Sequence, residues 1–511
     1  MRKGFIHCQI YNQEAQAFLI DEGKFVKFGT NEEIIRLTGN DELIDLNGMF
    51  VLPGFVDSHM HLAELGYYLS QLQLLGTSSM DSLKRKFESY LKEHEDATWI
   101  TGRGYDENQL GGTIDKQLLD ELCPEKPCVL TRVDGHVVVV NSKAIEVAQI
   151  DENTEVEGGA VHLETGLLEE NAIRLIYDIL PQPDGIQLRK YIEKAMALAN
   201  SYGVTTVGSD DFISMNRDYR IALDTFEKMS YQQALTVRVN EQCEFYSPKE
   251  FSTFLDDGYT TDVGNDYFKI GPLKLILDGT LGSCTAALRK PYENNPNNKG
   301  ILNVSDEDLE LYTKLACRFN MGVIAHAIGD EAVQKAIDAF KEIVYEGNMF
   351  HTGLVHCQIL GQDQIDEIIK MKLSCYFQSL FLEDDIPLLE ERIGKERAKT
   401  CYPFKTLMEN TLASNGSDAP VCMPNVIHGI SLAVNGVEGA QETLSIQQAL
   451  DSYTINGAKQ LFMDDKIGHL EEGYYADFVV LDQNLLTIQK EEIDQTKVMM
   501  TVMNGEIVFE R

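Results

Sequence analysis

Two histidines separated by one residue are the first feature of the sequence that could do chemistry. His59 and His61 follow a largely apolar run over residues 51–57, which is typical of a buried strand. Because alternate side chains of a strand point the same way, both imidazoles could reach one metal ion. Two histidines with this spacing are, by themselves, more often structural. Their place at the end of a predicted strand is what makes them a candidate metal site.

Three further candidate ligands stand at the ends of other β-type segments. They are His326, His356 and Asp418. A lone histidine at a strand end is usually a hydrogen-bonded polar residue. Four histidines and one aspartate in equivalent positions are harder to explain one by one, because a barrel of parallel strands brings the carboxyl ends of its strands to one place.

Eight β-type segments, most of them separated by helical patterns, are available to position these residues. This alternation is typical of βαβ units and a parallel sheet. Eight such strands predict an α/β protein with a closed, TIM-like (β/α)8 barrel. The predicted strands are residues 50–61, 204–210, 235–241, 273–279, 322–327, 353–358, 373–378 and 411–418.

The two ends of the chain are rich in short strand patterns and differ from the middle. Such patterns cover residues 4–11 and 17–28 at one end and 476–481 and 497–509 at the other. Hairpins this short are marginal alone. We therefore expect the termini to meet in a small composite β-sandwich domain, residues 1–49 with 464–511, beside a barrel domain over residues 50–463.

The stretch between the first two predicted strands is too long for one crossover and indicates an insertion over residues 64–202. An insertion after a barrel strand is expected at the barrel mouth, where substrates bind. We hypothesise that Tyr105, His136 and Asn141 line the substrate pocket from this insertion. Turn and packing roles within the insertion explain these three residues equally well.

The composition is that of a soluble globular protein. The 511 residues are 43% hydrophobic and 24% charged, and the net charge of -37 makes nucleic acids and anionic membranes poor partners. Ten cysteines without a CxxC pair argue against a redox motif or a disulfide framework. The first ten residues lack a secretory signal, so we expect a cytoplasmic protein that binds a small molecule and, if it oligomerises, forms a homodimer.

The motifs, taken in order, resemble those of the amidohydrolase superfamily. The run over residues 51–61 looks like the opening signature of that superfamily, and further stretches are similar to its YtcJ-like branch, which includes N-substituted formamide deformylases. The resemblance continues through residues 468–480. The further stretches are Asp134-Gly135-His136 with Asn141-Ser142-Lys143-Ala144, Lys274 through Asp278-Gly279-Thr280 to Thr285-Ala286, His326-Ala327-Ile328-Gly329-Asp330, and Gly416-Ser417-Asp418-Ala419-Pro420.

The resemblance implies a binuclear metal centre at these positions. His59 and His61 would hold one ion and His326 and His356 a second, while Asp418 would ligate the centre and transfer protons. Zinc is the first choice of metal, although iron, manganese and nickel also suit imidazole and carboxylate ligands.

Lys274 is the sixth residue that the resemblance assigns to the centre. The resemblance implies that carbon dioxide carboxylates this lysine. A carbamate would bridge two cations, whereas an ammonium would repel them. The ordinary alternative is an unmodified lysine in an ion pair.

The implied activity is hydrolysis of a carbon–nitrogen bond, in an amide or formamide, by metal-activated water, with Asp418 carrying the proton to the leaving nitrogen. A deaminase, and a cyclic amide or ester hydrolase, are alternatives on the same barrel. Deaminases of the superfamily often carry a glutamate three residues after the strand-five histidine, where this chain has Gly329. A non-catalytic scaffold would typically have lost metal ligands, and all six are present.

Overall fold

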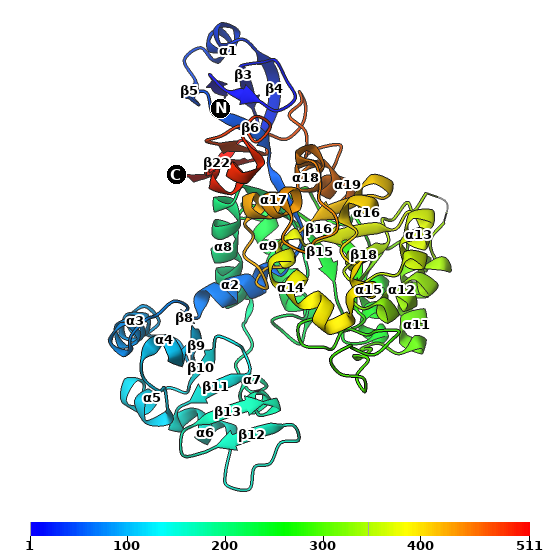
Figure 1. Cartoon of the computed structure of the whole chain (residues 1–511). Coiled ribbons are helices and arrows are strands. Elements are labelled where there is room, and N and C mark those ends of the chain that lie inside the picture. The colour runs from blue at the N-terminus through cyan, green and yellow to red at the C-terminus, as the bar shows by residue number, and fades with distance from the viewer. Residues whose placement is uncertain (1, 346) are drawn as a thin grey trace. The chain divides into compact units, whose positions relative to one another are not determined.

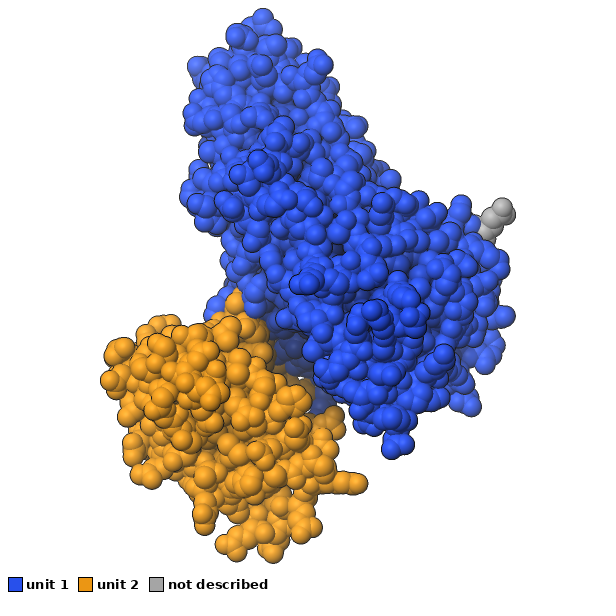
Figure 2. Space-filling model, viewed as in Figure 1, with its two compact units in different colours: residues 1–65, 185–511 blue, residues 66–184 orange. Residues whose placement is uncertain are grey.

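The computed structural model describes residues 2–345 and 347–511, which form two compact units. Unit 1 comprises Met1–Leu65 and Gly185–Arg511, and unit 2 comprises Gly66–Asp184 (Figure 2). Unit 1 contains all six predicted metal ligands, whereas the three predicted substrate-binding residues lie in unit 2.

Eight parallel strands form the centre of unit 1 (Figure 1). Each strand pairs with the next one along the chain. The amide of Asp418, after the last strand, donates to the His59 carbonyl in the first, and the His61 amide donates to the Ala419 carbonyl, each over 2.8 Å. The predicted TIM-like barrel is therefore confirmed. Its strands are β7 (Phe55–Met60), β14 (Val204–Ser209), β15 (Arg238–Cys243), β16 (Phe268–Ile276), β17 (Val323–Ala327), β18 (Gly353–His356), β19 (Ser374–Phe377) and β20 (Ala413–Asn415).

Amphipathic helices follow most of these strands. In α12 (Asp330–Lys341), Val333, Ile337 and Phe340 recur at helical spacing and are buried, while two acidic residues in the first turn favour the start of the helix. The other main helices of the barrel are α8 (Gly185–Ser201), α9 (Tyr219–Tyr231), α10 (Pro248–Asp256), α11 (Asp306–Arg318), α13 (Gln362–Met371), α14 (Leu382–Ile393), α16 (Phe404–Asn410), α17 (Val426–Asn435), α18 (Ile446–Ser452) and α19 (Ile455–Gln460).

Strands from both ends of the chain share one five-stranded sheet in unit 1. In this sheet β6 (Phe50–Pro53) pairs antiparallel with β21 (Phe478–Leu481), so an N-terminal strand is joined to a C-terminal one. The rings of Phe5, Phe18 and Phe478 pack at centroid distances of 4.9 to 5.2 Å and connect this sheet to a four-stranded one. The remaining strands are β2 (Gln9–Ile10), β22 (Val498–Met503) and β23 (Glu506–Glu510) in the first sheet and β4 (Lys24–Gly29), β3 (Ala17–Asp21), β1 (Lys3–Ile6) and β5 (Glu42–Asp45) in the second.

The single strand predicted over residues 50–61 is wrong, because the structure divides it at Gly54. The part before Gly54 is β6 of the terminal sheet, and the part after it is β7 of the barrel. A Cβ atom at residue 54 would overlap the Thr205 hydroxyl, so only glycine lets the chain pass between the two sheets here. Both strands are fully buried, so the apolar run gives no sign of the break.

Unit 2 is a separate α/β unit with a six-stranded sheet. Hydrophobic clusters pack this sheet against the helices α3 (Met80–Glu93), α5 (Lys116–Leu122) and α6 (Ser142–Ala148). Its residues lie within the stretch predicted as an insertion, but α8, at the end of that stretch, belongs to unit 1. In sheet order, the strands are β12 (Gly159–His162), β13 (Leu167–Glu170), β11 (Val137–Val140), β10 (Cys128–Arg132), β9 (Ile100–Tyr105) and β8 (Leu72–Gln73).

All ten cysteines have free thiols. Across the described ranges, the helices are too short or too polar to span a lipid bilayer.

Candidate metal centre

The carboxyl ends of five barrel strands bring the six predicted ligands together. Five of the six side chains are buried or nearly so, and His61 is the most exposed, at 19%. His59 lies in β7 with His61 directly after it, Lys274 lies in β16, His326 in β17, His356 in β18, and Asp418 follows β20.

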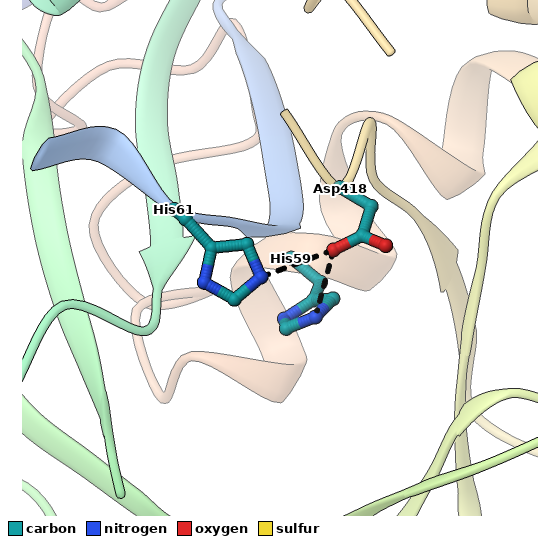
Figure 3. Close-up of side chains that lie close together, drawn as sticks. All are labelled: His59, His61 and Asp418. Atoms are coloured by element: carbon teal, nitrogen blue, oxygen red, sulfur yellow. Dashed lines mark ion pairs between the residues drawn. The ribbon is translucent and has the colours of Figure 1, made fainter. Parts of the chain in front are cut away.

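His59, His61 and Asp418 form the first cluster (Figure 3). The Asp418 Oδ1 atom lies 3.3 Å from the Nε2 atom of His59 and 3.2 Å from that of His61. Asp418 has a left-handed backbone with a φ of 57°, and the hydrogen bond from its amide to His59 holds it there. This backbone turns the carboxylate toward the two imidazoles.

His326 and His356 form a second cluster beside the first. The His326 Nδ1 atom lies 2.9 Å from the His356 Nε2 atom, and the His356 ring centroid is 5.9 Å from that of His59. The Lys274 Nζ atom lies 3.0 Å from His59 Nε2. The lysine, the four histidines and Asp418 therefore occupy one continuous site.

A buried glutamine fixes the tautomer of His59. The Gln242 side chain donates from Nε2 to the Ser58 carbonyl, so its Oε1 atom is the acceptor that faces His59 Nδ1 at 2.5 Å. The Nδ1 atom of His59 must then carry the proton. The lone pair of Nε2 is left facing Asp418 and Lys274.

Hydrogen bonds also fix the tautomers of His356 and His326, and they make the Nδ1 atom of His61 a donor. Gln378 donates to the Tyr376 carbonyl and accepts from His356 Nδ1 over 2.7 Å, so His356 also presents an Nε2 lone pair. The His61 Nδ1 atom faces the Asp210 carbonyl at 2.9 Å. His326 differs, because its Nε2 atom faces the Gly279 carbonyl at 3.2 Å and its Nδ1 lone pair points inward.

Two lone pairs therefore face each other between His326 and His356 without a proton between them. Burial, followed by the nearby Lys274, lowers the pKa of His326 to about 4, and burial, followed by His326, holds the pKa of His356 well below its usual range. Neutral imidazoles in this position repel each other unless a cation lies between them. Neighbouring ligands on an ion 2.0–2.1 Å from each would be roughly 2.9–3.4 Å apart, and the observed separations of 2.9, 3.2 and 3.3 Å fit that spacing.

Asp418 and His61 form an ion pair. Burial alone would lower the pKa of His61, but the hydrogen bond and charge of Asp418 raise it to about 10. Burial alone would raise the pKa of Asp418, but its close contacts with the imidazoles of His59 and His61 hold it well below its usual range. A divalent cation bound here would take the place of the His61 proton.

The three residues of unit 2 have different surroundings. Asn141 is fully buried, and its side chain accepts from the Cys128 and Ala144 amides and donates to the Cys123 and Lys126 carbonyls. These bonds support the packing role that the sequence left open for Asn141. Tyr105 is also buried, in the core of unit 2. His136 is exposed, and its Nδ1 atom lies 3.0 Å from the Oε2 atom of Glu170. Substrate binding by the three stays a prediction.

The comparison with known families agrees with this geometry. A family model described as the amidohydrolase family matches residues 42–509.

The chain belongs to the amidohydrolase family.

As a family member, it is a metal-dependent hydrolase. It is 30% identical to the Bacillus subtilis (strain 168) protein YtcJ, which is named as an amidohydrolase, over 99% of this chain and 98% of that one. It is 21% identical to the N-substituted formamide deformylase of Arthrobacter pascens over 98% and 96% of the two chains. The structure is similar to that of an uncharacterised metal-dependent hydrolase from Pyrococcus furiosus, with a TM-score of 0.81, 28% identity and coverage of 95% of this chain and 100% of that one.

Replacing Gln378 is expected to weaken metal binding by this amidohydrolase. Gln378→Leu removes the acceptor that fixes the His356 tautomer, and loss of such a partner typically costs 10- to 100-fold in metal affinity. Competition with a chromogenic chelator measures the affinity, and Gln378→Glu, which restores an acceptor, should recover most of it.

Gln460→Leu is the matched control for Gln378→Leu. Gln460 is equally buried, but it donates to the carbonyls of Cys375 and Leu412 and contacts none of the ligands. Its replacement should leave metal affinity unchanged. Equal metal affinities for wild type and folded Gln378→Leu would mean that Gln378 has no effect on metal binding.

Proposed function

We propose that the protein hydrolyses a carbon–nitrogen bond of a small organic substrate, in a non-peptide amide or a formamide. The observation that carries the proposal is the set of unprotonated nitrogens of His59, His326 and His356, which converge beside the Asp418 carboxylate. The similarity to an N-substituted formamide deformylase along nearly the whole chain supports the formamide bond in particular.

The residues present fit two divalent cations, with zinc as the first choice and iron, manganese or nickel as alternatives. His59 and His61 would hold one cation and His326 and His356 the other, with Asp418 as a further ligand of the centre and a carboxylated Lys274 as a bridge. When bound, such cations make water a stronger acid and polarise a carbonyl group.

Asp418 supplies the proton transfer that hydrolysis of an amide needs. Its carboxylate is ionised because its pKa lies well below the usual range, so it accepts a proton from the attacking water. The same carboxyl group then donates that proton to the leaving nitrogen. Asp418 is only 8% exposed, so few solvent molecules compete for the proton.

The position of Gly329 disfavours a deaminase of the kind that carries a glutamate there. A Cβ atom at residue 329 would overlap the Ala287 carbonyl, and the Gly329 amide donates to Asp278 over 2.8 Å. A glutamate could not occupy this position without a shift of the backbone. A cyclic amide or ester hydrolase has no such conflict and remains the second candidate.

Removal of metal tests the proposal directly. Protein treated with a chelator should lose at least about a hundred-fold of its activity toward N-formyl and N-acyl amines and regain it with zinc, manganese, iron or nickel. Cyclic amides, esters and aminated heterocycles in the same screen distinguish the alternatives. The proposal fails if metal-loaded protein cleaves none of the amides and formamides. The cytoplasmic location and the homodimer stay predictions from the sequence.

A further inference from the structure

Asp210 is a buried carboxylate with no part in the proposed hydrolysis. It directly follows β14 and is fully buried, and within residues 2–345 and 347–511 neither of its side-chain oxygens has a hydrogen-bond donor. Its backbone is fixed to the first barrel strand, because its amide donates to the Met60 carbonyl over 2.9 Å and its own carbonyl accepts from His61. This carboxylate, which has no hydrogen-bond donor, is therefore held in place beside the metal centre.

Lys274 is the cationic group that faces this carboxylate. The Lys274 Nζ atom lies 3.7 Å from Asp210 Oδ2, which is beyond hydrogen-bonding distance, and 3.0 Å from His59 Nε2. The nearest contact of an ammonium in this position is the lone pair of His59 Nε2, which a metal would need as its ligand. An unmodified lysine therefore gives Asp210 no hydrogen bond and blocks a ligand of the metal site.

Two neighbouring acidic side chains, those of Asp211 and Glu241, have hydrogen-bond donors. Asp211 accepts from the Ala63 amide over 2.8 Å and from the Ser209 hydroxyl over 2.6 Å. Glu241 accepts from the Asp211 amide over 2.9 Å. Of these three acids, Asp210 is the one whose two side-chain oxygens both lack a donor.

Carboxylation would change what the lysine offers to Asp210. The neutral amine attacks the carbon of carbon dioxide, a nitrogen–carbon bond forms, one carbon–oxygen π pair moves onto oxygen, and one proton leaves the nitrogen for water. The product nitrogen keeps one N–H group, which cannot bind a cation. A buried N–H group needs an acceptor.

We propose that Asp210 accepts the hydrogen bond of the N–H group of carboxylated Lys274, whose nitrogen would move closer to Asp210 Oδ2 than its present 3.7 Å, and thereby turns the carbamate oxygens toward the histidines. The proposal rests on the carboxylated lysine of the proposed function. Asp210 is then a positioning residue, since it acts on the metal centre through Lys274.

A simple counter-ion role for Asp210 predicts the opposite effect on carboxylation. A carboxylate that only stabilises the lysine ammonium holds the amine in the form that cannot react with carbon dioxide. Its removal would then increase the carbamate, whereas removal of an acceptor that the carbamate needs would decrease it. The sign of the change separates the two roles.

The experiment measures carbamate and metal in Asp210→Asn and Asp210→Leu. Zinc-loaded proteins in ¹³C-bicarbonate are compared by the ¹³C NMR signal of the carbamate carbon and by zinc per chain. We expect Asp210→Leu to lower the equilibrium constant for carboxylation by about ten-fold or more, because it removes a charged acceptor. Asp210→Asn keeps a neutral acceptor and should lower it by about five-fold.

Asp224→Asn is the matched control for the loss of charge. Asp224 lies on α9, the helix that follows β14, is exposed and pairs with Lys228. Its replacement should change neither signal. If Asp210→Leu does not fold, the sign of the change in Asp210→Asn still decides between the two roles.

The outcomes also separate this inference from the proposed function. An unchanged or larger carbamate signal in the Asp210 variants overturns the inference, as does the absence of any carbamate in wild type. Wild-type protein that hydrolyses amides without a carbamate would keep the proposed function and lose the inference. A carbamate that depends on Asp210, found in protein that cleaves no amide, would keep the inference and overturn the proposed function.

Discussion

Asp418→Asn is expected to lower kcat/KM for a substrate found in the screen by about a thousand-fold, or about 4 kcal/mol in the free energy of activation. The substitution keeps the shape of the side chain and removes its negative charge. Asparagine cannot accept the proton of the attacking water or pass it to the leaving nitrogen. Steady-state kinetics with metal-loaded protein measures the change.

The metal content of the same variant separates proton transfer from ligation. The Oδ1 atom of Asp418 faces His59 and His61, so some loss of metal is also expected. The values of kcat/KM are therefore divided by the amount of metal bound per chain before they are compared. Asp385→Asn is the control, because Asp385 is a partly buried acid on α14 that accepts from the Tyr402 hydroxyl and contacts none of the ligands. A wild-type rate in Asp418→Asn would mean that Asp418 has no part in catalysis.

The ligands could be predicted because their residue types are rare at strand ends and their chemistry is specific. Histidine and aspartate at the ends of apolar segments give a signal that does not depend on the exact strand boundaries. The strand after Gly54 and the strand at 238–243 were displaced by several residues from the predicted ranges, yet the ligands still fell at the same end of the barrel.

The residues that support the ligands could not be predicted in this way. Gln242 and Gln378 are ordinary polar residues in the sequence, and only their contacts with His59 and His356 give them a role. A polar residue at the end of a buried strand is the one signal that they offered. Asp210 closed a predicted strand, but its lack of a hydrogen-bond donor is a fact of three dimensions.

The break at Gly54 shows a second limit of reasoning from the sequence. A continuous apolar run predicts burial, but it does not say in which sheet each part is buried. The answer depends on β21, which lies more than 400 residues away and pairs with the first part of the run. Long-range pairing of this kind leaves little local trace.

Arg238 and Asp477 connect the barrel to the terminal sheets within unit 1. Arg238, in β15, donates to both oxygens of Asp477 over 2.6 and 3.0 Å, and both side chains are almost fully buried. Asp477 immediately precedes β21 and also accepts from the Asn504 amide over 2.6 Å. The Arg238 guanidinium further lies 4.3 Å from the centroid of the Tyr475 ring. The ion pair therefore sits inside a closed polar network between two layers of the unit.

Arg238→Met is expected to lower the free energy of unfolding by about 3–5 kcal/mol, because it leaves the buried Asp477 carboxylate without its cation. Arg189→Met removes an exposed arginine that pairs with Glu193 over 2.7 Å on α8, and it should change stability by less than about 1 kcal/mol. Urea unfolding followed by circular dichroism compares the two variants. The double variant Arg238→Met with Asp477→Leu should recover most of the loss, because it removes both charges together. A loss in Arg238→Met as small as that in Arg189→Met would show that the buried pair does not hold the barrel to the terminal sheets.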